Sequence, residues 1–259
     1  MADRPRATTM PASCSRTAAT DDLAPRRADM RGDPPATASV RIPTTGGAVV
    51  DGDLVVPAGA SGVVAFAHGS GSGRHSPRNR HVAEVLQAGG LATLLMDLLT
   101  LEEEAVDAVT RELRFDIGLL SKRAVDTLDW LGADPATAGL AVGIFGASTG
   151  AAAALVAAAL RPDLVRAVVS RGGRPDLAAG ALGRVRAPTL LVVGGEDTTV
   201  IRLNRDALAR LGCERELRIV PGATHLFEEP GTLDVVAALA REWFVARLGP
   251  PAQRPDGDR

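Results

Sequence analysis

Short apolar runs alternate with stretches of helical periodicity through the middle of the chain. A strand that is covered on both faces is apolar at nearly every position, so six of these runs predict strands of a mostly parallel sheet that helices cover on both faces. The runs lie at 62–67, 91–96, 140–145, 164–169, 189–193 and 217–220. Two further strands, at 40–43 and 49–56, flank a Gly46-Gly47 turn and predict an antiparallel opening pair.

Helix-forming stretches stand between the buried runs. We predict helices at 78–87, 115–131, 201–211 and 233–248, and another in the alanine-rich segment after Gly150. The acidic stretch Glu102-Glu103-Glu104 is interpreted as part of a loop. Eight mostly parallel strands with helices on both faces predict the α/β-hydrolase fold. Because no long insertion follows the run at 164–169, we expect one domain without a cap.

The two ends of the chain differ from this centre in composition. Residues 1–39 are rich in Pro, Arg, Asp and Thr and nearly free of large apolar side chains, which predicts a disordered tail. Residues 249–259 predict a second flexible tail, so the hydrolase domain is placed at 40–248.

Charge and cysteine content limit the partners and the compartment. The formal net charge of −2 gives no electrostatic reason to expect nucleic acid or an anionic membrane as a partner. Cys14 and Cys213 are the only cysteines, which predicts no disulfide framework. No apolar run is suited to a signal peptide core or a membrane span, so we expect a cytoplasmic protein.

The run at 140–145 leads into Gly146-Ala147-Ser148-Thr149-Gly150. G-x-S-x-G between a strand and a helix is typical of the nucleophile elbow, a strained turn that lifts a serine oxygen above the sheet. Small residues are needed there because the two backbones pass close together. The pentapeptide also arises by chance in a chain rich in Gly, Ala and Ser, so the flanking strand and helix carry the interpretation. Ser148 is the predicted nucleophile.

A serine nucleophile needs a base, and the base needs an acid that orients it. His225 follows the last strand and Asp197 follows the strand before it, so we predict a triad of Ser148, Asp197 and His225, in the chain order of this fold. Alternatively, His225 is an ordinary loop histidine and Asp197 only caps the next helix, although Asp197 is able to do both. Asp176 is the second candidate for the acid, and Asp97 is expected to steady neighbouring loops.

Acyl transfer also needs N–H donors for the developing oxyanion. We predict the backbone N–H of Thr149, directly after the nucleophile, and that of Ser70, in the loop after the strand at 62–67. Gly69 and Gly71 are alternatives to Ser70.

The glycine-rich loop at 69–76 and the nearby histidines predict no cofactor. No Gly-Lys-Ser/Thr ends the loop, and Arg74 and Ser76 stand where G-x-G-x-x-G needs glycine, so we expect no nucleotide site. His68, His75 and His81 lack metal-binding spacing with acids, so we expect no metal.

Substrate binding is assigned to His68, Gly69 and Arg171. Four arginines stand in or beside loops at the strand ends, namely Arg74, Arg78, Arg171 and Arg174. One or two of them are able to bind a carboxylate or phosphate bidentately. The alternative, which we favour, is that they are solvated or paired with Asp97 and the acidic stretch after it.

Five segments together resemble one bacterial family, the small α/β-hydrolases that are dienelactone hydrolase-like and often fused or adjacent to a phosphoribosyltransferase domain. The segments are HGSGSGRHSPRNR (68–80), DLLTLEEE (97–104), GASTG (146–150), SRGGRPD (170–176) and GATHLFEEPG (222–231). The resemblance implies hydrolase activity with Ser148, Asp197 and His225. True dienelactone hydrolases use a cysteine nucleophile, so the resemblance does not carry their substrate to Ser148. It also implies a functional link to a phosphoribosyltransferase, which we expect on a separate protein.

These residues predict a cofactor-free serine hydrolase of ester, thioester or lactone bonds in a small molecule, working through an acyl-enzyme. Two alternatives stay open. One is an acyltransferase with the same triad, and the other is a non-catalytic binding protein on this scaffold.

Overall fold

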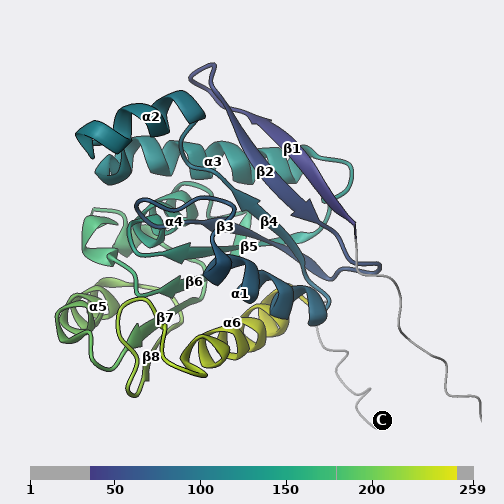
Figure 1. The fold of residues 1–259 in the computed structure, drawn as a ribbon. Coiled ribbons are helices and arrows are strands. Elements are labelled where there is room, and N and C mark those ends of the chain that lie inside the picture. The colour runs from purple at the N-terminus through teal and green to yellow at the C-terminus, as the bar shows by residue number, and fades with distance from the viewer. Residues whose placement is uncertain (1–35, 179, 250–259) are drawn as a thin grey trace, which may run out of the picture. The chain divides into compact units, whose positions relative to one another are not determined.

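The structure is a computed structural model, and it describes residues 36–178 and 180–249 (Figure 1). Most of the predicted tail at 1–39 and almost all of that at 249–259 lie outside the described residues, so both disordered tails stay predictions. Within the described range, the first strand begins at Thr37, earlier than the predicted start of the domain at residue 40.

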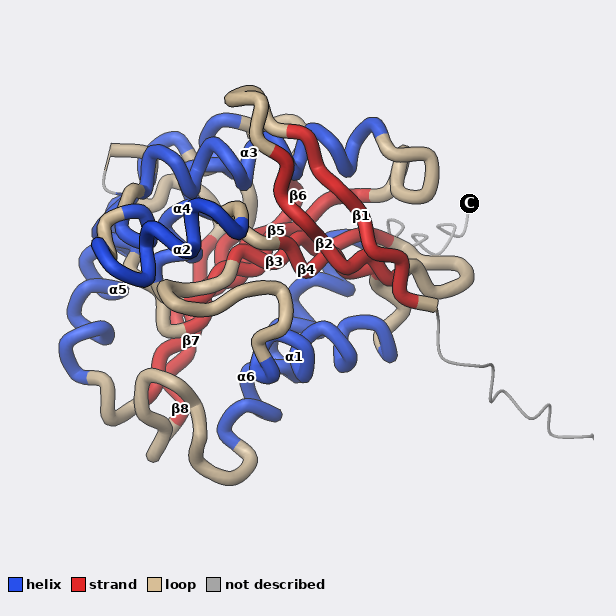
Figure 2. Tube along the Cα trace, turned by 45° about the horizontal axis from the view of Figure 1, so that its top comes forward, coloured by secondary structure: helices blue, strands red, loops and turns tan. Residues whose placement is uncertain are grey.

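Within the described residues, eight strands form one sheet in the order β1-β2-β4-β3-β5-β6-β7-β8 (Figure 2). They are β1 Thr37–Pro43, β2 Val49–Val55, β3 Gly62–Ala67, β4 Ala92–Met96, β5 Ala141–Ala147, β6 Val165–Arg171, β7 Thr189–Gly194 and β8 Arg215–Val220. The pairs β1–β2 and β2–β4 are antiparallel, and the other neighbouring pairs are parallel. This topology confirms the predicted α/β-hydrolase fold.

Helices cover both faces of the sheet (Figure 1). On one face lie α1 Pro77–Ala88 and α6 Thr232–Leu248, and on the other lie α3 Ile117–Ala133, α4 Thr149–Leu160 and α5 Thr198–Arg210. In β3, Val63 and Ala65 join the apolar cluster beneath α3 and α4, whereas Val64 and Phe66 join the cluster beneath α1 and α6. Successive side chains of a strand point to opposite faces, so burial on both faces requires the continuously apolar runs seen in the sequence.

The segment after β4 is a helix, α2 Leu101–Thr110, and the predicted acidic loop is therefore wrong. Thr100 and Glu103 form a capping box, in which each side chain accepts a hydrogen bond from the backbone N–H of the other residue. Three acidic residues in the first turn also suit the positive end of the helix dipole. The Thr-x-x-Glu pattern was present in the sequence, but it preceded no buried run: Asp107 is the only buried residue of α2.

The segment between β6 and β7 carries two short 3-10 helices, Pro175–Ala178 and Leu182–Arg184. They lie close to α4 and α5, and the described residues there form no separate layer over the sheet, as predicted. None of the described helices combines the length and apolar character that crossing a membrane requires.

Candidate active site

Ser148 sits in a strained turn between β5 and α4. Its backbone has φ 50° and ψ −120°, a conformation that residues with a side chain rarely adopt. The neighbouring glycines are dictated by space: a Cβ on Gly150 would lie 2.3 Å from the carbonyl oxygens of Ala67 and His68, and one on Gly146 would lie 2.4 Å from Ala151 Cα. The elbow predicted from G-x-S-x-G therefore has the expected geometry.

The loop after β3 passes directly over this turn. A Cβ on Gly69 would lie 3.0 Å from Ser148 Cβ, so glycine is what allows the approach. The Ser70 hydroxyl lies 2.9 Å from the Thr149 hydroxyl, which brings the two residues predicted as oxyanion donors together. Within the described residues, no backbone hydrogen bond occupies the N–H of Ser70 or of Thr149. Their role as oxyanion donors stays a prediction.

His68 is buried beneath the same loop, and both of its ring nitrogens are engaged. Nδ1–H donates to the carbonyl of Gly69 at 3.0 Å, and Nε2 accepts from the N–H of Leu98 at 3.0 Å. These bonds require the neutral ring. Burial lowers the pKa of His68 below its ordinary value of 6.5, against the opposing effects of the Gly69 bond and the charge of Asp97. The ring, predicted to bind substrate, thus has both nitrogens committed to fixing the loop that carries Gly69.

Asp197 and His225 meet above the carboxyl ends of β7 and β8. Asp197 Oδ2 lies 2.7 Å from His225 Nδ1, while Asp197 Oδ1 accepts the N–H of Val200 and caps α5. The aspartate therefore contacts His225 and caps α5 at the same time, and its role as the orienting acid stays a prediction. A Cβ on Gly194 would lie 2.4 Å from the carbonyl oxygen of Ala223, so this glycine permits the two loops to touch.

Gly172 brings the imidazole loop beside the elbow. The Ser148 N–H donates to the carbonyl of Arg171 at 3.1 Å, and the next residue, Gly172, has φ 51°. A Cβ on Gly172 would lie 3.1 Å from the His225 carbonyl oxygen and 3.5 Å from ring atom Cε1. No hydrogen bond joins the Ser148 hydroxyl to His225 in the described part of the chain, so the third link of the triad stays a prediction. Sequence reasoning missed Gly172, whose signal was the Gly-Gly pair after β6.

The alternative acid is otherwise occupied. Both carboxylate oxygens of Asp176 bind the guanidinium of Arg174, at 2.9 and 2.8 Å. Asp97 accepts the backbone N–H of Arg74 at 2.7 Å and also binds its guanidinium, so it steadies the loop after β3, as expected. Asp197 is the carboxylate that reaches His225.

The loop arginines divide into three that have a carboxylate partner and one that has none. Arg74 and Arg174 are paired as above, and Arg78 Nη1 lies 3.2 Å from Glu228. The predicted partners were Asp97 and the acidic stretch after it, and this holds for Arg74 alone, because Arg78 and Arg174 pair with other acids. Arg171 is 8% exposed, and its side chain makes no hydrogen bond or ion pair with any described residue. Burial, together with the charge of Arg78, lowers the pKa of Arg171 to about 10, so it remains charged at neutral pH.

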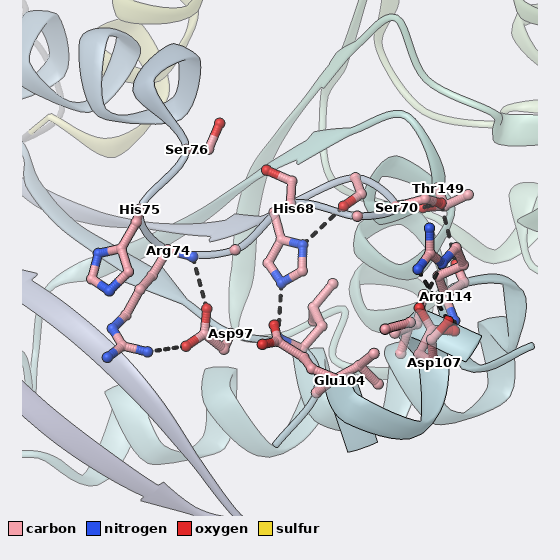
Figure 3. A pocket seen from close by; sticks show the side chains of 18 of the residues that line it. His68, Ser70, Arg74, His75, Ser76, Asp97, Glu104, Asp107, Arg114 and Thr149 are labelled. Carbon is pink, nitrogen blue, oxygen red and sulfur yellow. Dashed lines mark hydrogen bonds and ion pairs between the residues drawn. The ribbon is translucent and has the colours of Figure 1, made fainter. Parts of the chain in front are cut away.

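A cleft of about 680 Å³ opens beside the elbow (Figure 3). Ser70 and Thr149 lie in its wall, Leu98 and Leu120 supply apolar lining, and α2 contributes Glu104. Burial and then the charge of Asp97 raise the pKa of Glu104. The lining includes neither Ser148 nor His225, so the cleft lies beside the predicted nucleophile, on the side of the predicted oxyanion donors. No group of three or more His, Cys, Asp or Glu side chains among the described residues is arranged to hold a metal ion.

Comparisons with known proteins show the family and the fold of this chain. The dienelactone hydrolase family matches residues 52–246. A crystal structure of a dienelactone hydrolase from Anabaena variabilis is 61% identical, with a TM-score of 0.81 over 83% of this chain and 99% of that chain. Est1E from Butyrivibrio proteoclasticus shares the fold at 15% identity, with a TM-score of 0.65 over 80% of this chain and 97% of its own.

A curated relative shows how much of a longer protein this chain matches. A putative phosphoribosyl transferase of Mycobacterium tuberculosis is 56% identical over 223 residues, which make up 86% of this chain but 49% of that protein. The chain therefore spans about half the length of the curated relatives that it matches.

Proposed function

We propose a reaction for this chain on the premise that it belongs to the dienelactone hydrolase family and is an α/β-hydrolase. The chain hydrolyses ester, thioester or lactone bonds of a small molecule through an acyl-enzyme on Ser148. The observation that carries the proposal is the pairing of His225 with Asp197 at 2.7 Å, next to a serine held at positive φ in the elbow.

In the proposed mechanism, His225 removes the hydroxyl proton of Ser148 as the serine oxygen attacks the substrate carbonyl. Asp197 holds the imidazole through Nδ1, which leaves Nε2 as the proton acceptor, and it stabilises the imidazolium that forms. The backbone N–H groups of Thr149 and Ser70 bind the oxyanion. His225 then protonates the leaving group, and a water that His225 deprotonates attacks the acyl-enzyme to release the acid.

Because the predicted nucleophile is a serine, we do not assign a dienelactone as the substrate. The elbow holds a hydroxyl rather than a thiol. A serine hydroxyl depends more strongly on a neighbouring base than a cysteine thiol does, because a much smaller fraction of it is ionised at neutral pH. The short bond between Asp197 and His225 supports such a base. We therefore extend the proposal to esters, thioesters and lactones in general.

The direct test is a panel of 4-nitrophenyl esters, a thioester and γ- and δ-lactones, assayed with wild type and with Ser148→Ala. Wild type is expected to turn over at least one member. For that substrate, the kcat of Ser148→Ala is expected to be lower than that of wild type by roughly 10⁴-fold or more. Equal rates with both proteins would refute a serine mechanism.

The two alternative functions are separated by adding acceptors. An acyltransferase releases 4-nitrophenol faster when an alcohol or amine is present and forms the corresponding ester or amide. A hydrolase forms the free acid at an unchanged rate. A non-catalytic binding protein turns over no member of the panel.

The relative from M. tuberculosis supports a partner. Because the chain matches about half of a protein named putative phosphoribosyl transferase, we propose that the hydrolase works together with a phosphoribosyltransferase. Affinity purification of the tagged full chain from its own cells, followed by mass spectrometry, is expected to recover such an enzyme. Recovery from a Ser148→Ala strain tests whether the association depends on turnover, and no enrichment over an untagged strain contradicts the partner.

A further inference from the structure

We propose that a chain of hydroxyl groups, anchored on Asp107 of α2, holds the two predicted oxyanion donors at their working distance from each other. Asp107 and the hydroxyl of Ser70 are then positioning groups, because they act through the backbone N–H groups of Ser70 and Thr149. The inference rests on the proposed hydrolysis at Ser148 and adds the contacts by which the fold places those two donors.

Asp107 is a buried carboxylate that the chain supplies with partners from one short segment. It is 3% exposed and is the only buried residue of α2. Its Oδ1 accepts the backbone N–H of Arg114 at 2.9 Å, and its Oδ2 accepts from Nε of the same residue at 2.5 Å. Its carbonyl accepts the N–H of Arg111 at 2.8 Å. Asp107 therefore fixes both the backbone and the side chain of Arg114.

Stability alone does not account for an ion pair at this place. Replacing a buried ion pair by apolar side chains is often neutral or stabilising. α2 does not follow that course: it buries the charge of Asp107 and leaves Leu101 and Val109 72% and 84% exposed. A carboxylate that binds both the backbone and the side chain of Arg114 specifies where the segment after α2 lies, which apolar packing does less exactly.

From Arg114 the contacts lead to the loop after β3 (Figure 3). The Ser70 hydroxyl donates to the carbonyl of Arg114 at 3.4 Å and lies 2.9 Å from the Thr149 hydroxyl. Because Ser70 has only one hydroxyl proton, the proton between the two hydroxyl groups is that of Thr149. A Cβ on Gly71 would lie 3.4 Å from Nη1 of Arg114, so the guanidinium also lies against the loop.

The two hydroxyl groups belong to the same residues as the two predicted N–H donors. Thr149 is 2% exposed and is the first residue of α4, so the helix fixes its place. Ser70 stands in a loop, and its bonds to Thr149 and to Arg114 supply the support that a helix would give. Oxyanion binding requires donors that are aimed before the charge develops, and a displacement of about 1 Å typically costs about 100-fold in rate. The chain of contacts should therefore affect the transition state more than the bound substrate.

The test measures kcat and KM for the best ester, together with the inhibition constant of a trifluoromethyl ketone. A serine adds to this ketone to give a tetrahedral oxyanion, so its affinity reports the N–H donors. Ser70→Ala is expected to lower kcat about 10-fold and Asp107→Ala about 10- to 100-fold, with KM within about threefold of wild type. Affinity for the ketone should fall by the same factor as kcat/KM.

Two further variants separate positioning from a loss of fold. Asp107→Asn keeps an oxygen that accepts the N–H of Arg114, so its kcat should lie between those of Asp107→Ala and wild type. If Asp107→Ala does not fold, Asp107→Asn and Ser70→Ala carry the test. The double variant Ser70→Ala/Asp107→Ala should lose less than the product of the two single losses, because both act through one chain of contacts.

Asp116→Asn is the matched control. Asp116 is exposed, accepts the N–H of Leu119 at 2.9 Å and caps α3, and it does not line the cleft. Asparagine is also a good N-cap, so kcat and the affinity for the ketone should stay within about threefold of wild type.

The proposal is overturned if Ser70→Ala and Asp107→Ala keep the wild-type kcat and ketone affinity, if they raise KM alone, or if the double variant shows the full product of the single losses. A failure of the proposed hydrolysis looks different, since wild type then cleaves no ester. Hydrogen exchange needs no turnover. Faster exchange in residues 69–73 of Ser70→Ala and Asp107→Ala than of Asp116→Asn supports the proposed support of the loop, and equal exchange contradicts it.

Discussion

The turn that carries Ser148 and the cleft beside it are built by different means. Around Gly146 and Gly150 the elbow is fixed by backbone contact, with no space for even one additional carbon atom. The cleft is shaped by side chains: Arg74 on Asp97, and Arg114 on Asp107 of α2 (Figure 3). The proposed chemistry is thus tied to close backbone packing, whereas the cleft, where we propose that the substrate binds, is shaped by pairs of charged side chains. Substitutions in the elbow and the residues that contact it should abolish turnover. Substitutions in the cleft that leave the contacts of Asp107 and Ser70 intact should alter substrate selectivity or the local stability.

The largest effect is expected from the orienting acid. Asp197→Asn keeps the shape but removes the charge that fixes the His225 tautomer, so kcat should fall roughly 10⁴-fold on whichever ester is the best substrate. Asp176→Asn is the matched control, because Asp176 pairs with Arg174, and its kcat should stay within about threefold of wild type. The reverse order of the two losses would assign the acid to Asp176.

A smaller effect is expected where the loop meets the elbow. Gly69→Ala introduces a Cβ 3.0 Å from Ser148 Cβ and 3.2 Å from the carbonyl oxygen of Ala147, which forces the loop away from the serine. A displacement of about 1 Å at a reacting centre typically costs about 100-fold in rate. Gly132→Ala is the control, because its new Cβ would meet only Leu164 at 3.8 Å. If Gly69→Ala keeps the wild-type kcat, this loop does not contribute to binding of the oxyanion.

The pH dependence of stability tests how His68 fixes the loop that carries Gly69. Its folded-state pKa lies below 6.5, so the unfolded chain takes up a proton before the folded chain does. The free energy of unfolding should therefore fall as pH drops below 6.5, by up to about 1.4 kcal/mol per pH unit. In urea titrations at pH 7.5 and 5.5, the stability advantage of wild type over His68→Gln should shrink at the lower pH. If the stability difference between wild type and His68→Gln grows at pH 5.5, the pKa of folded His68 is raised rather than lowered, which contradicts the prediction.

The smallest effect belongs to the capping box on the cleft side. Thr100→Ala removes the hydroxyl that accepts the N–H of Glu103, which should cost about 1 kcal/mol and loosen α2. Hydrogen exchange should accelerate in residues 101–110, while α3 keeps its protection. Thr110→Ala, at the other end of α2, is the control for an exposed hydroxyl that accepts one backbone N–H, that of Glu112 at 3.3 Å. Equal acceleration in both variants would show that the capping box does not specifically stabilise α2.

The same contrast explains what the sequence could predict. The elbow, its strand and its helix were predictable because close backbone contact leaves few residue types that fit. The loop of Asp197 follows β7, which is buried throughout, and the loop of His225 follows β8, whose apolar residues Leu217, Ile219 and Val220 marked its end. The helix α2 was missed because its residues are mostly exposed, so no apolar periodicity marked it. Fold and triad candidates thus followed from local pattern and strand order.

The partners of the loop arginines could not be predicted in the same way. Arg171 and Arg174 stand three positions apart and have similar surroundings in the sequence. Arg174 reaches Asp176, two residues away, whereas Arg171 feels the charge of a second arginine, Arg78 of α1. Whether a charge finds a partner depends on tertiary placement, so the open charge became visible only in three dimensions.

The identity of the nucleophile is tested most directly by a fluorophosphonate probe followed by mass spectrometry of the intact protein and its peptides. The probe phosphonylates serines that a neighbouring base has activated, with loss of fluoride, so it reports the elbow and the Asp197–His225 pair together. We predict one adduct per chain, located on Ser148 and absent from Ser148→Ala. An unlabelled wild type, or an adduct that persists on another residue in Ser148→Ala, would contradict the account.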